Sequence, residues 1–185
     1  MIQGKNGNRR HGALFLLPVL TSAAPFLLSC PSQGRVTKDD IAAIGFKDGD
    51  IIFQESSSPQ SLAIQTATGS RYSHCGIIIV NNGQPYVYEA ISRVSRTPVL
   101  DWIKRGVDGH YVLMRLRDRD QLLDQAKLDA MKKVGRSFSG KKYDLLFQWS
   151  DDTMYCSELV WKIYEIGAGL APPPLPPLSR SPLFP

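Results

Sequence analysis

One short segment limits the possible folds more than any other, because residues 73–90 predict a β-hairpin. Residues 73–80 are rich in β-branched side chains, which favour a strand. Asn82-Gly83 follows, and this dipeptide is the strongest short-range signal for a two-residue hairpin turn. Residues 86–90 then return as the second strand. We therefore expect a fold built around an antiparallel sheet.

The register of this hairpin places two chemically active side chains on one face of the sheet. With a two-residue turn, Asn81 faces Gln84, and His74 then lies diagonally across from Glu89. Diagonal neighbours share a face and lie roughly 7 Å apart at Cα. A carboxylate bound to a ring nitrogen fixes the tautomer of a histidine that acts as a base. A register shifted by one residue would separate the pair, and a surface or hydrogen-bonded role for His74 is the alternative.

A cysteine at the start of the last predicted helix is the third candidate. This helix is expected over residues 156–165, with Cys156 in its first turn. The positive end of the helix dipole lowers the pKa of a thiol there, so Cys156 is a candidate nucleophile. The alternative is a small core hydrophobe on the buried stripe of the helix. Cys75 follows His74 directly, so its side chain must point to the opposite face, and we expect a packed thiol.

The remaining patterns predict a mixture of helices and strands. Ser58-Pro59 is typical of a helix start, with Ser58 as the cap of a helix that runs to Gly69. The other expected elements are a strand over residues 51–53, a helix over 100–105, a strand over 111–116 and an amphipathic helix over 120–134.

The N-terminus predicts export. Basic residues precede an apolar stretch over residues 13–28, and prolines make this stretch too short and too interrupted to span a membrane. Leu27-Leu28-Ser29-Cys30 resembles a bacterial lipobox, whose cysteine receives a diacylglyceryl group and becomes the first residue after cleavage. We expect a lipoprotein signal peptide over residues 1–29, lipidation of Cys30 and a tether over residues 30–45. An ordinary cleaved signal peptide, which would give a soluble periplasmic protein, is the alternative.

The compartment that follows is the bacterial cell envelope, with the protein anchored to a membrane by its lipid and facing the periplasm. Pro31, rather than an aspartate, comes second in the mature chain and favours the outer membrane. The formal net charge is +5, and three of the basic residues that contribute to it lie in the first 29 positions. No basic run with interleaved aromatic residues follows them. Nucleic-acid binding is therefore not expected. The two remaining thiols and three histidines lack metal-ligand spacing, so no metal or other cofactor is expected.

Four motifs occur in one order along the chain. They are Gly49-Asp50-Ile51-Ile52-Phe53-Gln54, Tyr72-Ser73-His74-Cys75-Gly76, Tyr88-Glu89-Ala90 and Tyr155-Cys156-Ser157-Glu158-Leu159-Val160-Trp161. Together they resemble the circularly permuted papain-like amidases of the YiiX/YaeF group, which are related to NlpC-type cell-wall hydrolases, and the YiiX branch in particular. The resemblance covers roughly residues 46–168. We assign residues 46–170 to one domain and residues 171–185 to a proline-rich tail.

This resemblance implies an α+β, circularly permuted papain-like (NlpC-type) fold, in which a small antiparallel sheet packs on the helix of the catalytic cysteine. It implies a triad of Cys156, His74 and Glu89, which would act through an acyl-enzyme, and Tyr72 and Tyr155 are candidates to line the substrate cleft. The expected function is that of a cysteine peptidase or amidase acting on peptidoglycan peptides or lipid amides. A lipid acyltransferase of the same fold and a non-catalytic envelope-binding module are the alternatives.

Overall fold

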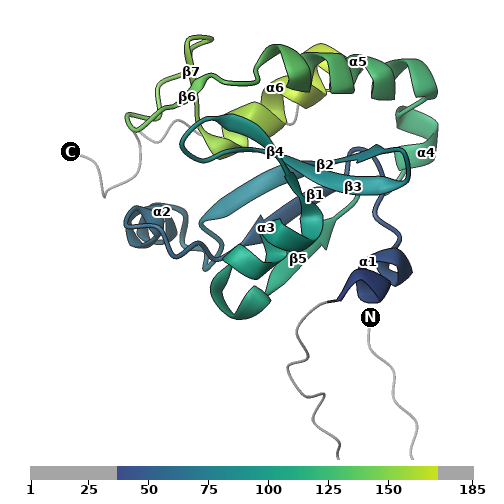
Figure 1. Ribbon diagram of the computed structural model, residues 1–185. Coiled ribbons are helices and arrows are strands. Elements are labelled where there is room, and N and C mark those ends of the chain that lie inside the picture. The colour runs from purple at the N-terminus through teal and green to yellow at the C-terminus, as the bar shows by residue number, and fades with distance from the viewer. Residues whose placement is uncertain (1–36, 171–185) are drawn as a thin grey trace, which may run out of the picture. The chain divides into compact units, whose positions relative to one another are not determined.

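The computed structural model describes residues 37–170 (Figure 1). The predicted signal peptide, the predicted lipidation site at Cys30 and the proline-rich tail lie outside these residues. In chain order the elements are α1 (Lys38–Ile44), β1 (Ile51–Gln54), α2 (Ser61–Thr68), β2 (His74–Asn81), β3 (Gln84–Ala90), β4 (Val94–Pro98), α3 (Val99–Arg105), the 3₁₀ turn η1 (Val107–Gly109), β5 (Tyr111–Met114), α4 (Arg119–Leu122), α5 (Gln125–Ser137), β6 (Lys142–Tyr143), β7 (Thr153–Met154) and α6 (Cys156–Ala168).

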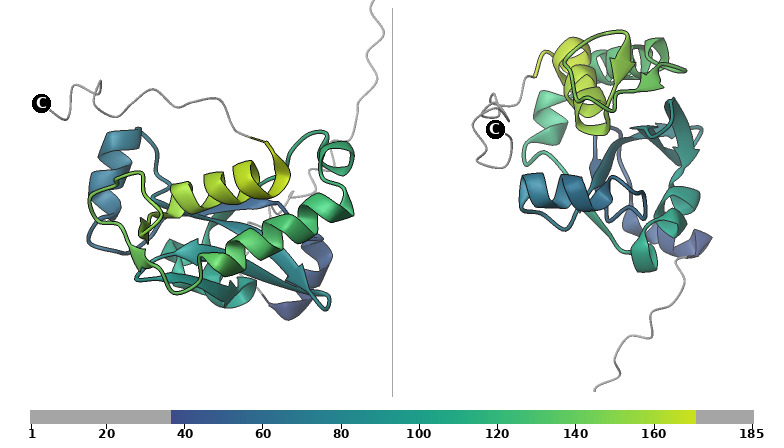
Figure 2. Two further views of the ribbon diagram at one scale, coloured as in Figure 1. Left: turned by 90° about the horizontal axis from the view of Figure 1, so that it is seen from above. Right: turned by 90° about the vertical axis from the view of Figure 1, so that its left-hand side faces the viewer.

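A five-stranded sheet in the order β4-β3-β2-β1-β5 forms the centre of the fold, and all its pairs are antiparallel. Helices α5 and α6 cover one face, and α3 packs against the other (Figures 1 and 2). The prediction of an α+β fold with a small antiparallel sheet packed on the Cys156 helix is therefore confirmed.

The predicted hairpin and its register are confirmed. Asn81 pairs with Gln84 and Ile77 with Tyr88, as a two-residue turn requires. Asn82 and Gly83 both have positive φ, at 49° and 75°, which a type I′ turn needs at both central positions. The right-handed twist of the strands favours this turn, and the turn fixes which residues of β2 face which helix.

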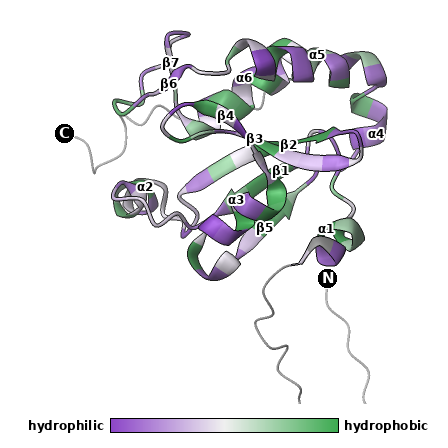
Figure 3. Cartoon of the chain, in the orientation of Figure 1, coloured by the Kyte–Doolittle hydropathy of each residue, from purple (hydrophilic) through white to green (hydrophobic). Residues whose placement is uncertain are grey.

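Strand alternation divides the interior into two clusters. Cys75, Ile77 and Ile79 of β2 face α5 and α6, where they join a large apolar cluster. Ile78 faces the opposite way and packs with Trp102 of α3. Figure 3 shows hydrophilic and hydrophobic residues alternating along α5, as expected of a helix with one face on this core.

Helices α5 and α6 approach each other closely, which fixes the position of α6 on the sheet. A Cβ at Gly167 would lie 2.6 Å from the Cα of Met131, a distance that real contacts do not show. Gly167 therefore allows two backbones to meet where any side chain would hold them apart. A Cβ at Gly135 of α5 would meet the Tyr88 ring of β3 at 3.3 Å and the Ile163 side chain of α6 at 3.4 Å, which is tight but not excluded.

Two helix predictions were wrong in their boundaries. The helix expected from Ser58 begins at Ser61, because residues 58–60 form a turn in which the Ser58 carbonyl accepts from the Ser61 amide at 3.0 Å. The single helix expected over residues 120–134 is two helices, α4 and α5. Asp124 separates them, because its side chain accepts from the Lys127 amide at 2.9 Å and caps the start of α5.

Other parts of the architecture were not predicted. The 30–45 segment expected to be a tether contains α1, whose Thr37 and Asp40 form a capping box. Strand β4 was missed, because it contains a Ser, an Arg and a Pro and only its first residue, Val94, is buried. Within residues 37–170, no helix is long and apolar enough to cross a membrane.

Candidate active site

Glu89 lies on β3 with none of its surface exposed and four hydrogen-bond donors around it. Its Oε2 accepts from the His74 Nε2 at 2.6 Å, the Trp102 Nε1 at 3.0 Å and the Arg105 guanidinium at 2.5 Å. Its Oε1 accepts from the Thr97 hydroxyl at 2.6 Å. Burial on its own would raise the pKa of Glu89, but the bonds from His74 and Arg105 lower that pKa to about 2. The side chain is thus a carboxylate at any ordinary pH.

His74 is held in one orientation by Glu89 and Trp102. Its ring stacks on the Trp102 indole, with 5.8 Å between the ring centroids, and its Nε2 is hydrogen-bonded to the Glu89 carboxylate. Cys156 lines the same cavity as His74, and the two side chains act on each other's pKa. Burial lowers the pKa of His74, but the contacts with Cys156 and Glu89 outweigh it and raise the pKa to about 9.

Cys156 is the first residue of α6 and is only 7% exposed. A hydrogen bond from the Cys75 side chain lowers the pKa of Cys156 well below its usual value; burial opposes this effect, and His74 reinforces it. The raised pKa of His74 and the lowered pKa of Cys156 are two sides of the same contact. At neutral pH they favour a thiolate beside an imidazolium.

Cys75 occupies the face of β2 opposite His74, as predicted, but its packing partner was not foreseen. It is a buried thiol in the same apolar cluster as Cys156, and the two line the same cavity. The interaction with the Cys156 side chain and burial raise the pKa of Cys75 well above its usual value. The two thiols therefore differ sharply, with Cys75 protonated where Cys156 is ionised.

Tyr143 also contacts Cys156, and the sequence analysis missed it. It belongs to β6, a two-residue strand that pairs in parallel with β7 just before α6. Burial raises the pKa of Tyr143, and so do the nearby Cys156 and Cys75. Nothing in the local pattern marks this residue, because a two-residue strand has no periodicity to detect.

An ion cluster of the buried Lys162 and Glu158 with the exposed Asp151 holds the loop before α6 in place. The ammonium of Lys162, which is 5% exposed, lies 2.8 Å from Glu158 and 2.7 Å from Asp151, and it also donates to the Ser150 carbonyl. Glu158 accepts in turn from the backbone amides of Ser150 at 3.2 Å and Tyr155 at 3.4 Å. Because Tyr155 is the N-cap of α6, this cluster positions Cys156 at the helix start.

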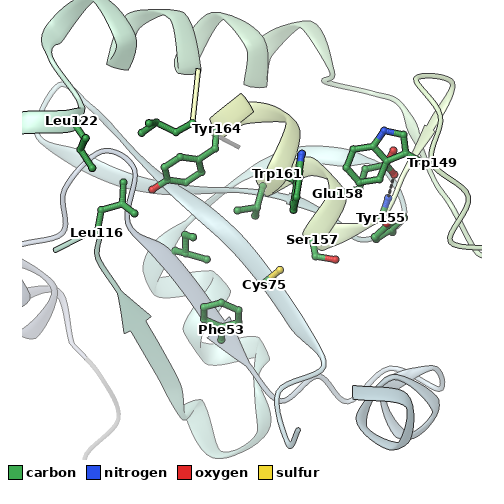
Figure 4. A pocket seen from close by; sticks show the side chains of 13 residues that line it. Phe53, Cys75, Leu116, Leu122, Trp149, Tyr155, Ser157, Glu158, Trp161 and Tyr164 are labelled. Carbon is green, nitrogen blue, oxygen red and sulfur yellow. Dashed lines mark hydrogen bonds between the residues drawn. The ribbon is translucent and has the colours of Figure 1, made fainter. Parts of the chain in front are cut away.

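Two adjoining cavities open at the thiols. One, of about 330 Å³, is lined by both cysteines, His74 and Tyr72. The other, of about 450 Å³, runs along α6 past Tyr155 (Figure 4). The residues common to both are Phe53, Cys75 and Ser157. Their sizes are those of small-molecule sites.

The two tyrosines predicted to line a cleft both border these cavities. Tyr72 lines the smaller one and stacks on His110, with its hydroxyl 3.3 Å from the His110 Nε2. Tyr155 lines the larger one, beside Ser157. Within residues 37–170, no group of three His, Cys, Asp or Glu side chains is arranged to hold a metal ion.

A thiol at a helix start, facing a histidine and a carboxylate on neighbouring antiparallel strands, defines the papain-like class of fold. Here the histidine strand precedes the cysteine helix in the chain, which is the order of the permuted members of that class. The comparison with family models agrees: residues 45–173 match the permuted papain-like amidase family, YaeF/YiiX, C92. This chain belongs to that family.

Two known proteins show the relationship at closer range. The chain is 46% identical over 122 residues to the uncharacterized protein YiiX of Escherichia coli strain K12, a match that covers 66% of this chain and 59% of YiiX. The crystal structure of the metalloprotein YiiX from E. coli O157:H7 superimposes with a TM-score of 0.63 and 44% identity, covering 67% of each chain. The chain thus spans less than two thirds of the length of the curated relative that it matches.

Proposed function

We propose that this chain is a cysteine amidase in which Cys156 is the nucleophile, His74 is its base and Glu89 orients that base. One observation carries the proposal: Cys156 at the start of α6 lines the same cavity as His74, and His74 is bonded at 2.6 Å to the buried Glu89 carboxylate. A lowered thiol pKa at a helix start, beside a histidine with a raised pKa, provides the thiolate that attacks carbonyl carbons. Membership of an amidase family supports the same conclusion.

In the proposed reaction the Cys156 thiolate attacks the carbonyl carbon of an amide. The oxyanion that forms is stabilised by the backbone N–H of Cys156, which has no partner within the helix at this position, and by the Tyr143 hydroxyl. The His74 imidazolium gives its proton to the departing amine, which leaves an acyl-enzyme. His74 then accepts a proton from water as the water attacks the thioester, and the acid is released.

The lining of the two cavities favours lipid amides over peptidoglycan peptides as substrates. Among residues 37–170, the only charged side chain that lines the larger cavity is Glu158, and Lys162 and two backbone amides already pair with it. The wall is otherwise formed mostly by apolar and aromatic side chains, among them Leu116, Trp149 and Trp161. A peptide with free carboxylates and amines would find few partners there, whereas an alkyl chain would replace water on apolar surface.

The same apolar lining would also accommodate a lipid acceptor, so acyl transfer to a lipid is the second candidate function. The acyl-enzyme is common to both reactions, and they differ in whether water or a lipid nucleophile resolves it. We also propose, from the N-terminal sequence alone, that the protein acts in the cell envelope and is held there by a lipid on Cys30.

A substrate panel tests the proposal. Purified protein is incubated with a long-chain N-acyl amide, a short-chain analogue and muropeptides, in buffer and with a lipid acceptor. We expect release of fatty acid from the long-chain amide, an acyl adduct on Cys156 by mass spectrometry and no turnover in Cys156→Ala. Cleavage of muropeptides alone would reverse the substrate assignment, and an acylated lipid product would make the enzyme a transferase.

A thiol probe separates an enzyme from a binding module. Iodoacetamide at mildly acidic pH should modify Cys156 well before Cys75, because the pKa of Cys156 is lowered and that of Cys75 is raised. Unfolded protein serves as the control, in which both thiols should react slowly and alike. Faster reaction at Cys75 in the folded protein would contradict the nucleophile assignment.

A further inference from the structure

Cys75 is a second thiol within reach of the nucleophile, and the proposed hydrolysis gives its sulfur no part in bond making. It is 7% exposed, like Cys156, and both line the smaller cavity. Figure 4 shows its sulfur pointing from β2 toward the first turn of α6, beside Ser157. Both thiols belong to one buried apolar cluster and line one cavity, and each acts on the pKa of the other, so the two sulfur atoms are close neighbours.

The environment gives the two thiols different chemistry. Cys156, with its lowered pKa, is the thiolate that an oxidant attacks first, whereas Cys75 remains a thiol with its proton. The shared cavity of about 330 Å³ leaves room for a molecule as small as a peroxide next to both. A reactive thiolate with a second cysteine at hand is the arrangement of redox-sensitive cysteine pairs.

We propose that Cys75 and Cys156 form a reversible oxidation site, in which peroxide converts the two thiols into a disulfide that blocks the nucleophile. The Cys156 thiolate attacks one oxygen of hydrogen peroxide, the O–O bond breaks, and the departing hydroxide takes a proton to become water. This leaves Cys156 as a sulfenic acid. The Cys75 sulfur then attacks the Cys156 sulfur, the S–S bond forms and the S–O bond breaks, and the proton of Cys75 leaves with the hydroxide as a second water.

The balance is two thiols and one peroxide giving one disulfide and two waters. A dithiol reductant reverses the change by attacking the disulfide and restoring both thiols. Without Cys75, the sulfenic acid at Cys156 has no neighbouring thiol and proceeds to sulfinic acid, which a dithiol does not reduce. Cys75 thus protects the nucleophile from irreversible oxidation.

The test uses the full chain in a Cys30→Ala background, so that Cys75 and Cys156 are its only thiols. The protein is treated with increasing hydrogen peroxide, denatured, alkylated and mapped without reduction. We expect a peptide pair joined through Cys75 and Cys156, loss of alkylation at both, and recovery of both after dithiothreitol. None of these measurements depends on turnover, so failure here leaves the amidase proposal standing. The blocking of the nucleophile rests on that proposal, whereas the formation of the disulfide is tested independently of it.

Two variants serve as matched controls. In Cys75→Ser, which keeps the size of the side chain, peroxide should convert Cys156 to sulfinic acid that dithiothreitol does not restore. In Cys156→Ser, the same peroxide dose should leave Cys75 reduced. Circular dichroism establishes that each variant is folded. If the parent protein accumulates sulfinic acid at Cys156 while Cys75 stays free to alkylate, Cys75 is a packing residue and the proposal is wrong.

Discussion

Glu89 is the residue on which the geometry of the site depends, because its two oxygens gather donors from three separate elements. His74 comes from β2, Thr97 from β4, and Trp102 and Arg105 from α3. A buried carboxylate without these donors would greatly lower the stability of the folded protein, so the four contacts and the ionised state depend on one another. The orientation of His74 therefore depends on elements that make no contact with a substrate.

Replacing Glu89 with Gln should raise the pKa of Cys156 while leaving the protein folded. The amide oxygen can accept from His74, Trp102 and Arg105 in the position of Oε2, and the amide nitrogen can donate to the Thr97 hydroxyl. The charge that stabilises the imidazolium is lost, so the pKa of His74 falls from about 9 and the thiolate loses support. The dependence of the rate of Cys156 alkylation on pH measures this change in pKa. The acid limb of that rate profile should move to higher pH in Glu89→Gln.

The control for this variant is Glu55→Gln. This substitution removes a carboxylate that pairs with Arg71, and Glu55 does not line either of the two cavities. Its alkylation profile should match the wild type. Activity in Glu89→Gln should fall by less than in Cys156→Ala, because an orienting residue usually costs less than the nucleophile. Identical profiles in wild type and Glu89→Gln would show that Glu89 is not coupled to the thiol.

The same variant makes a prediction about stability and pH. The pKa of Glu89 is about 2 in the folded protein and near 4.5 when unperturbed, so its contribution to stability is complete above pH 4.5 and is lost as the pH falls through 2. The difference in unfolding free energy between wild type and Glu89→Gln should therefore narrow from about pH 4.5 downward. Urea denaturation at several pH values measures this, and a constant difference would contradict the assignment.

At the scale of elements, the short β6–β7 sheet shapes the cysteine side of the site. It lies between α5 and α6 in the chain, and it brings the Tyr143 hydroxyl against Cys156. Tyr143→Phe should lower the rate of amide hydrolysis by about 10²-fold, as expected when one oxyanion donor is removed. Substrate KM should change little, because the hydroxyl acts on charge that develops in the transition state.

The matched control is Tyr111→Phe, a tyrosine of β5 that packs against the cluster of Ile52 and Trp102 and not against the cluster that holds Cys156 and Tyr143. Its hydrolysis rate should equal that of the wild type. Equal rates in all three proteins would show that Tyr143 packs beside the thiol without acting on the substrate.

The α5–α6 contact fixes the far end of the nucleophile helix. Gly167→Ala should lower the free energy of unfolding by about 1–3 kcal/mol, because the added Cβ meets the Met131 backbone and the two helices must separate. Ser137→Ala, at the exposed end of α5, is the control and should stay within about 0.5 kcal/mol of the wild type. Urea unfolding followed by circular dichroism measures both, and a neutral Gly167→Ala would mean that the helices can move apart freely.

These elements also show what the sequence can and cannot predict. The β2–β3 hairpin was predictable with its register, because the dipeptide at its turn and the β-branched run act locally. Helix α6 was predictable from its apolar stripe. Strand β4 and the contact of Tyr143 with Cys156 were not, because tertiary pairing creates them and no local periodicity marks them. The contact of Cys75 with Cys156 was missed because alternation gives the face of a strand and not its neighbour across the core.

At the scale of the whole molecule, the described domain is one part of a longer chain, whose N-terminal residues carry the predicted lipid anchor. Cys30→Ala should abolish labelling by a radioactive fatty acid and leave the precursor unprocessed or soluble. The wild-type mature protein should begin at Cys30, which N-terminal mass spectrometry measures. Cys156→Ala is the control, because it removes a thiol but should leave lipid labelling unchanged. A mature N-terminus anywhere else would rule out lipidation of Cys30.

The order of the site residues along the chain has a consequence for biosynthesis. A ribosome makes His74, Cys75 and Glu89 well before it reaches Cys156, which begins the last described helix. The hairpin can therefore pair while the nucleophile is still absent, and a nascent chain contains no activated thiolate. Even in a finished but unfolded chain Cys75 and Cys156 are ordinary cysteines, because the contacts that lower the pKa of Cys156 exist only after α6 docks on the sheet. Reactivity is thus acquired only when α6 has been synthesised and has docked on the hairpin.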